Sequence, residues 1–171
     1  MLDSTIKRKV FNLKVAIVMG SISDWPVMKE TASILDSFEI PYEKKVISAH
    51  RMPLELTEFA NNAKSEHFDV IIAGAGGAAH LPGMISANTS LPVIGVPIQT
   101  KALNGVDSLL SIVQMPFGVP VNTVAIGTAG AKNAGISAAE ILAINDEKLT
   151  HKILSFKEKQ HDEAVNTNEK L

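Results

Sequence analysis

The sequence predicts an α/β domain in which helices cover both faces of a parallel sheet. Five short strand-like segments recur along the 171 residues, and stretches with helical spacing separate them. Most of these segments are apolar at nearly every position, as is typical of strands buried on both faces. Parallel strands need crossover connections, and helices between the strands supply them.

The first unit is a strand over residues 14–20 followed by a helix. Apolar side chains fill the strand and Gly20 closes it. Ser23, Asp24 and Pro26 mark the helix start, because Ser and Asp cap helices and Pro suits their first turn. Apolar side chains then recur at helical spacing, at Val27, Met28, Ala32, Leu35 and Phe38.

The second unit begins after Pro41, which ends that helix. Residues 42–47 form a shorter, more polar strand, and residues 48–53 open the next helix. Further strands are expected over residues 69–73, 92–96 and 123–126. Five strands alternating with helices predict a flavodoxin-like three-layer sandwich with a five-stranded parallel sheet.

The two ends of the chain differ from this pattern. Residues 1–13 are predicted to be an N-terminal extension, residues 14–160 a single domain and residues 161–171 a C-terminal tail. The segment 146–171 is highly charged. One helical stripe within it, formed by Leu149, Ile153 and Phe156, predicts an added C-terminal helix before a frayed tail.

Composition excludes several classes of function. The formal net charge is −2, which argues against a nucleic-acid partner. The chain has no Cys, so thiol nucleophiles, Cys-based zinc sites and iron–sulfur clusters are excluded. Its most apolar stretch, residues 70–79, is far shorter than the ~20 residues that span a bilayer. No signal peptide or metal-ligand spacing is apparent, so we expect a cytoplasmic protein without a metal.

Ligands of open parallel sheets bind beyond the carboxyl ends of the strands, and three loops there are unusual. The first, Gly20-Ser21-Ile22-Ser23-Asp24, surrounds a helix start with hydroxyls and a carboxylate. Backbone N–H groups and the helix dipole favour phosphate there, and the carboxylate could accept hydrogen bonds from ribose hydroxyls. The alternative is that Ser23 or Asp24 only caps the helix.

The second loop, residues 48–53, places His50 beside Arg51 at the end of a strand. Histidine ordinarily titrates near pH ~6.5, which suits proton transfer, and arginine can hold a phosphate or carboxylate through two hydrogen bonds. The alternative is a surface loop with a capped helix. His67, His151 and His161 are expected to be surface residues.

The third loop, residues 73–83, has no side chain larger than a methyl group before His80. A ligand or another subunit could therefore approach its backbone closely. Neither the P-loop motif nor the dinucleotide-binding glycine motif is present. The loops at residues 95–99 and 114–120 could simply be turns.

Together these segments closely resemble the family of N5-carboxyaminoimidazole ribonucleotide mutases, the class I phosphoribosylaminoimidazole carboxylases of de novo purine synthesis. The resemblance runs from about Val15 to Ile153. Residues around Phe117 and Ile136-Ser137 are less typical of the family. The motifs that carry the resemblance are Met19-Gly20-Ser21-Ile22-Ser23-Asp24-Trp25, Ser48-Ala49-His50-Arg51, the segment 73–84, Gly105-Val106-Asp107-Ser108-Leu109 and Gln114-Met115-Pro116.

The resemblance implies an octamer whose active sites are completed by neighbouring subunits. It also implies that a carboxylate moves from the exocyclic N5 nitrogen of the substrate to ring carbon C4, without ATP, a metal or an organic cofactor. The expected partners are the ribonucleotide substrate, further copies of the chain and, functionally, the ATP-dependent carboxyaminoimidazole ribonucleotide synthase.

The family roles fall on residues already identified. His50 would shuttle the proton, and Asp24 would hold the ribose hydroxyls. The phosphate would be held by Ser21, Ser23 and Arg51. The base and the migrating carboxylate would lie against Ser48, Ala49, Gly74, Gly76, Gly77, His80 and Leu81.

Two other functions stay open at this point. A class II enzyme would carboxylate aminoimidazole ribonucleotide directly with carbon dioxide on the same fold. A non-catalytic phosphate, flavin or nucleotide-binding module would also suit a flavodoxin-like fold. The small number of aromatic residues, 5% of the chain, argues against flavin.

Overall fold

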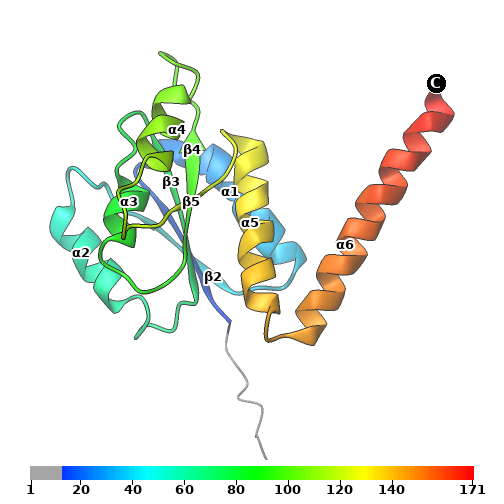
Figure 1. Ribbon diagram of the computed structural model, residues 1–171, viewed down its shortest axis with the longest axis horizontal. Helices are drawn as coiled ribbons and strands as arrows, with labels where there is room; N and C mark the ends of the chain where they lie inside the picture. Colours follow the sequence, from blue (N-terminus) through cyan, green and yellow to red (C-terminus); the bar gives the residue numbers. More distant parts are fainter. Residues whose placement is uncertain (1–12) are drawn as a thin grey trace, which may run out of the picture.

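A five-stranded, all-parallel sheet in the order β2-β1-β3-β4-β5 forms the centre of the domain (Figure 1). The chain passes from β1 outward to β2, then returns to β3 on the other side of β1. The direction of winding therefore reverses between β1 and β3, where open sheets bind ligands. The strands are β1 (Val15–Met19), β2 (Tyr42–Val46), β3 (Val70–Gly76), β4 (Val93–Ile98) and β5 (Asn122–Thr123).

The structure, a computed structural model, describes residues 13–171. The predicted N-terminal extension therefore lies, except for Leu13, outside the described residues. Within them, the predicted α/β class and five-stranded parallel sheet are confirmed.

Helices lie on both faces of the sheet and make the predicted three layers (Figure 1). One face is covered by α1 (Trp25–Ser37) and α5 (Thr128–Ala143), with α6 (Glu147–Asn166) beside them. The opposite face is covered by α2 (Pro53–Asn62), α3 (Leu81–Ser86) and α4 (Val106–Val113).

Strand β1 shows why two cores form. Its side chains alternate between the sheet faces, so Val15 and Ile17 join the α1 and α5 side while Ala16 and Val18 join the α2 and α3 side. All are 0–1% exposed. A strand with two buried faces has no polar position, which explains the continuous apolar run in the sequence.

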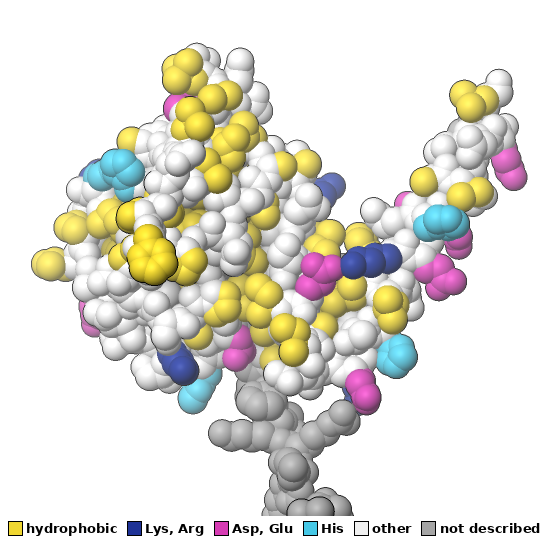
Figure 2. Space-filling model, in the orientation of Figure 1, with side chains coloured by type: hydrophobic (Ala, Val, Ile, Leu, Met, Phe, Trp, Pro, Cys, Tyr) yellow, Lys and Arg dark blue, Asp and Glu magenta, His cyan; other side chains and the backbone are white. Residues whose placement is uncertain are grey.

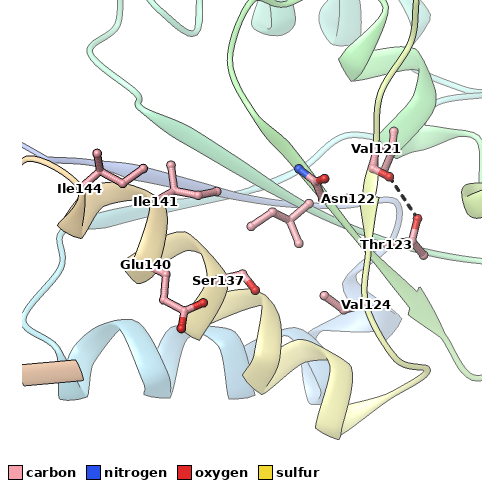
Figure 3. A pocket seen from close by; sticks show the side chains of 9 residues that line it. Val121, Asn122, Thr123, Val124, Ser137, Glu140, Ile141 and Ile144 are labelled. Atoms are coloured by element: carbon pink, nitrogen blue, oxygen red, sulfur yellow. Dashed lines mark hydrogen bonds between the residues drawn. The ribbon is translucent and has the colours of Figure 1, made fainter. Parts of the chain in front are cut away.

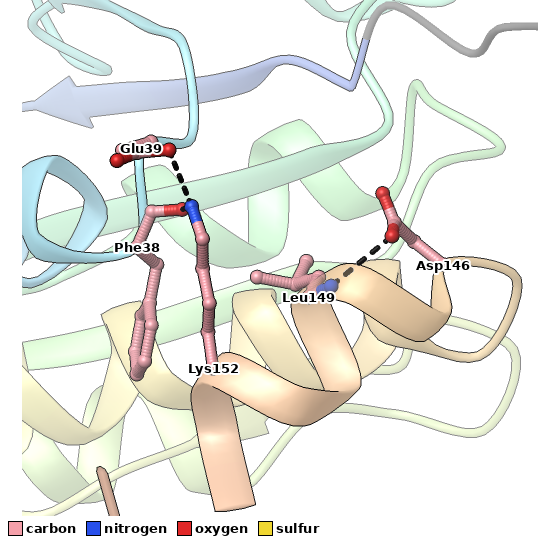
Figure 4. A network of polar contacts seen from close by, with 5 residues as sticks. All are labelled: Phe38, Glu39, Asp146, Leu149 and Lys152. Carbon is pink, nitrogen blue, oxygen red and sulfur yellow. Dashed lines mark hydrogen bonds and ion pairs between the residues drawn. The ribbon is translucent and has the colours of Figure 1, made fainter. Parts of the chain in front are cut away.

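Helix α6 packs on the domain through its first half only. Leu149 and Ile153 are buried, as the predicted stripe requires, and Phe156 meets Phe38 edge to face with ring centroids 5.5 Å apart. Lys152 donates to the Phe38 carbonyl at 3.2 Å and pairs with Glu39 (Figure 4).

The second half of α6 projects away from the domain (Figure 1). The described residues from 157 to 169 are exposed, and the helix continues past residue 160 to Asn166 before a short 3-10 turn, Thr167–Lys170. Helical backbone therefore continues through most of the segment predicted to be a C-terminal tail. Among the described residues, no helix has the length and apolarity required to span a membrane.

Strand β5 is shorter than expected, since it ends at Thr123 rather than at residue 126. The Val124 N–H still donates to Gly95, but the chain then turns to start α5, and Gly127 donates to Pro97. Val124 packs against the core without continuing the strand. In contrast, β3 and β4 extend beyond their expected ends, to Gly76 and Ile98.

Candidate active site

A pocket of about 440 Å³ lies at the carboxyl ends of β1, β2, β3 and β4. This is the edge of the sheet where the winding reverses. It brings together all the predicted site residues except Gly74. The lining residues are Gly20, Ser21, Ser23, Asp24, Ser48, Ala49, His50, Arg51, Ala75, Gly76, Gly77, Ala78, His80, Leu81, Ile98, Gln99 and Thr100.

The loop after β1 is held by a capping box around a 3-10 turn, Ile22–Asp24. The Ser21 N–H donates to the Asp24 carboxylate at 3.1 Å, and the Ser21 hydroxyl accepts from the Ser23 N–H at 3.2 Å. The Ser23 hydroxyl lies 2.8 Å from the Ser21 hydroxyl. The Asp24 side chain does not cap α1 itself; its carboxylate accepts the hydrogen bond within the loop and lines the pocket.

Asp24 is a buried carboxylate, with 8% of its surface exposed. Burial raises the pKa of Asp24 above its ordinary value of 3.8, because the charged form loses solvation. The hydrogen bond from the Ser21 N–H opposes this shift. An acceptor with little access to water is suited to hydroxyl groups of a ligand.

The loop after β2 separates buried from exposed residues within four positions. Ser48 and Ala49 are buried, whereas His50 and Arg51 are exposed. The Ser48 carbonyl accepts from the N–H groups of Arg51 and Met52, which makes a tight turn. The Arg51 Nε also donates to the Ser48 hydroxyl at 3.0 Å, so the guanidinium is anchored at the pocket rim.

The central feature of the pocket is a pair of imidazoles. His50 Nε2 lies 2.7 Å from His80 Nδ1, and the ring planes meet at 80°. One nitrogen must donate and the other accept, so the contact fixes both ring orientations and links their tautomers. The two residues follow different strands, and the fold brings them together.

Gly74 lies within β3 and is not among the residues that line this pocket, so the lining role that the family resemblance implies for it stays a prediction. A Cβ at this position would lie 2.4 Å from the sulfur of Met28, which is fully buried in α1. The Gly74 carbonyl accepts from the Gly20 N–H at 3.1 Å and so ties β3 to the end of β1. The absence of a side chain at this position serves helix packing.

Sequence reasoning missed the loop after β4, which contributes Ile98, Gln99 and Thr100 to the pocket. The Thr100 hydroxyl donates to the Asp107 carboxylate at 2.8 Å. The signal was present, since β4 neighbours β3 in this sheet order and its carboxyl end must lie at the same edge. Within residues 13–171, no three His, Asp or Glu side chains are grouped to hold a metal ion.

A larger hollow of about 680 Å³ lies between β5 and α5 (Figure 3). Its walls are mainly apolar, and Glu140 is the one ionisable residue among those that line it. It contains none of the residues that the sequence predicts for catalysis. The pocket with His50 and Arg51 is therefore the better candidate for chemistry, despite its smaller volume.

Comparison with known proteins shows the family of the chain. The sequence model of the AIRC family, described as AIR carboxylase, matches residues 14–163. A Vibrio parahaemolyticus protein named N5-carboxyaminoimidazole ribonucleotide mutase is 60% identical over 90% of this chain and 95% of its own length. A Bacillus subtilis protein of the same name is 57% identical over 92% of this chain and 97% of its own.

A solved structure supports the same relationship. The crystal structure of Treponema denticola PurE superposes with a TM-score of 0.82, at 27% identity, and covers 92% of this chain and 98% of that one. The family match spans nearly the whole described domain, including every loop of the pocket. The chain therefore belongs to the AIR carboxylase family.

Proposed function

We propose that this chain is an isomerase that converts N5-carboxyaminoimidazole ribonucleotide to 4-carboxy-5-aminoimidazole ribonucleotide in de novo purine biosynthesis. The observation that carries the proposal is the His50–His80 pair, joined at 2.7 Å in a pocket that also holds Arg51 and Asp24. Relatives of 56–60% identity bear the name of this mutase. Class II carboxylation and a non-catalytic binding module are the alternatives that the assay below separates.

The pocket supplies groups for each part of such a substrate. Arg51, Ser21 and Ser23 hold the phosphate, and Asp24 accepts from the ribose hydroxyls. The glycine loop lets the imidazole and its carboxylate approach the backbone, since no side chain before His80 is larger than a methyl group. The remaining lining roles fall to Ser48, Ala49, Gly76, Gly77, His80 and Leu81.

His50 acts first as an acid and then as a base. The bond between N5 and the carbamate carbon breaks as His50 delivers a proton to N5, which releases carbon dioxide into the pocket. Carbon C4 then attacks the trapped carbon dioxide, and the unprotonated imidazole removes the C4 proton to restore the aromatic ring. Each cycle returns the proton to His50, so the reaction consumes no cofactor. His80 keeps the His50 ring in the same orientation during both proton transfers.

Replacing Asp24 by Asn is expected to weaken binding of the carboxylated product about tenfold at neutral pH, because a charged acceptor becomes a neutral one. Since burial raises the pKa of Asp24, wild-type affinity should fall as the pH drops toward that raised value, and the variant should lack this part of the pH dependence. Calorimetric titration at several pH values measures both effects. Asp36→Asn, on the exposed side of α1, is the control. Equal affinities of wild type and Asp24→Asn would refute the ribose role.

A neighbouring subunit is needed to complete the site. His50, Arg51 and His80 are exposed in the single chain, yet the mechanism must keep carbon dioxide from escaping. Exposed apolar side chains gather over α4 and the loops beside it (Figure 2). They are Leu103, Val106, Leu110, Val113 and Phe117. This stripe supports assembly of several copies of the chain, and the family resemblance is the basis for proposing an octamer. On the same resemblance, the enzyme is proposed to act in the cytoplasm, after the ATP-dependent carboxyaminoimidazole ribonucleotide synthase.

Replacing Leu110 by Lys is expected to shift the assembly toward smaller species, because the charge would be desolvated at an apolar interface. Light scattering coupled to size-exclusion chromatography measures the mass. Leu54→Lys is the control, since Leu54 lies on α2, away from the stripe, and is 81% exposed. An unchanged mass in Leu110→Lys would place the interface elsewhere.

The assay of function offers two substrates to the purified chain. Product carboxylated at C4 is measured from N5-carboxyaminoimidazole ribonucleotide, and separately from aminoimidazole ribonucleotide with bicarbonate, each against an enzyme-free control. Turnover of the carbamate alone supports the mutase. Efficient use of the free amine at low carbon dioxide would make the chain a class II carboxylase, and no turnover of either would favour the binding module.

A further inference from the structure

The loop that delivers His80 to the pocket has no polar side chain with which to hold its own shape. Residues 74–79 are Gly-Ala-Gly-Gly-Ala-Ala, and Gly77 takes a left-handed conformation with φ +67°. Glycine-rich backbone is costly to order, because it loses more conformational freedom than other residues do. Whatever orders this loop must therefore come from another element.

That element is α4, which contacts the Gly77 peptide with two hydroxyls. The Gly77 N–H donates to the Ser108 hydroxyl at 2.9 Å, and Ser108 in turn donates to the Ile98 carbonyl at 2.7 Å. The Ser111 hydroxyl lies 3.1 Å from the Gly77 carbonyl and 2.7 Å from the Asp107 carbonyl. Both polar groups of Gly77 thus meet hydroxyls of one helix.

Ser108 is the stronger of the two tethers. Its side chain is 0% exposed, so no water can take over either hydrogen bond. The hydroxyl uses its proton on the end of β4 and its oxygen on the loop after β3. It therefore couples the ends of two neighbouring strands at the pocket edge.

The position of Gly77 then governs that of His80. Ala79 donates to the Gly77 carbonyl at 2.8 Å, and the His80 N–H donates to the Ala78 carbonyl at 2.8 Å. His80 directly precedes α3 and contacts His50 at 2.7 Å. We propose that Ser108 is a positioning residue that sets the Gly77 peptide, and through it His80, so that the His50 ring is aligned for proton transfer. The inference rests on the role proposed above for His50.

The test compares Ser108→Ala with Thr31→Val. Thr31 is also 0% exposed, and its hydroxyl donates to the Ala131 carbonyl at 2.7 Å, between α1 and α5. Both variants lose one buried hydroxyl, but Thr31 lies outside the pocket wall. In the wild type and both variants, kcat and KM for the carbamate substrate are measured together with hydrogen exchange at the Gly77 amide.

We expect Ser108→Ala to lower kcat about 10- to 100-fold, as a displaced catalytic group does, with faster exchange at Gly77. Its KM should change by less than about threefold, since the phosphate and ribose contacts are untouched. Thr31→Val should lose a similar amount of thermal stability and keep kcat and the Gly77 exchange rate of the wild type.

Two results would overturn the proposal. One is a loss of kcat in Ser108→Ala no larger than in Thr31→Val, and the other is an unchanged exchange rate at Gly77. If instead the wild-type chain shows no turnover of the carbamate, the proposed function fails. In that case hydrogen exchange at the Gly77 amide still tests the hydrogen bond between Gly77 and Ser108, because this measurement needs no substrate.

Discussion

Replacing His50 by Asn is expected to lower kcat by about 10²- to 10⁴-fold, the usual contribution of a general acid or base. Asn keeps a polar group near His80, but its amide cannot take up a proton and return it as an imidazole can. Arg51 and the loop after β1 remain in place, so affinity for the carboxylated product should change little. The loss should therefore fall on kcat and not on binding.

Stopped-flow or coupled assays of the carbamate substrate give kcat, and calorimetry with the product gives affinity. His67→Asn is a matched control, because His67 is exposed and has φ 66°, a conformation that Asn also accepts. Near-normal turnover in His50→Asn would show that another group transfers the proton.

Replacing Gly130 by Ala is expected to cost about 3 kcal/mol or more of stability, which is the range of severe packing conflicts. A Cβ at this position would lie 1.6 Å from the carbonyl oxygen of Ala125 and 2.5 Å from its carbonyl carbon. Both atoms are backbone, so no side-chain rotation relieves the overlap. The junction between β5 and α5 must open to accept even a methyl group.

Urea unfolding at fixed chain concentration measures this effect. Gly118→Ala is the comparison, because its Cβ would meet nothing within 4 Å and only its φ of +94° opposes the change. That conformational cost is about 1–2 kcal/mol. Similar midpoints for the two variants would mean that the β5 to α5 junction relaxes freely.

Much of the fold follows from local pattern. The run from Val15 to Met19 lies on two buried faces, so its lack of polar residues is enough to predict a central parallel strand. The loops that follow such strands lie at one edge of the sheet, which predicts that Asp24 and His50 lie near the same binding site. Both residues line one pocket at that edge, while their contacts with the substrate stay predictions.

The features that local pattern did not predict concern residues whose surroundings come from distant parts of the chain. Gly74 stands in a glycine run that resembles a ligand loop, yet the atom that forbids a side chain there belongs to Met28. Residues 124–126 are as apolar as a strand, but they pack at the turn into α5 and do not continue the ladder. The contact of His50 with His80 likewise depends on the order of the strands.

The tether between Gly77 and Ser108 has a consequence for how the chain folds. The two residues are 31 positions apart, and β4 lies between them in the sequence. When β1 and β3 have paired in a nascent chain, the loop after β3 is therefore not yet ordered, because Ser108 has not yet formed its hydrogen bond to Gly77. If Ser108 positions His80 as proposed, catalytic competence is expected only after the central strands have assembled, when α4 docks.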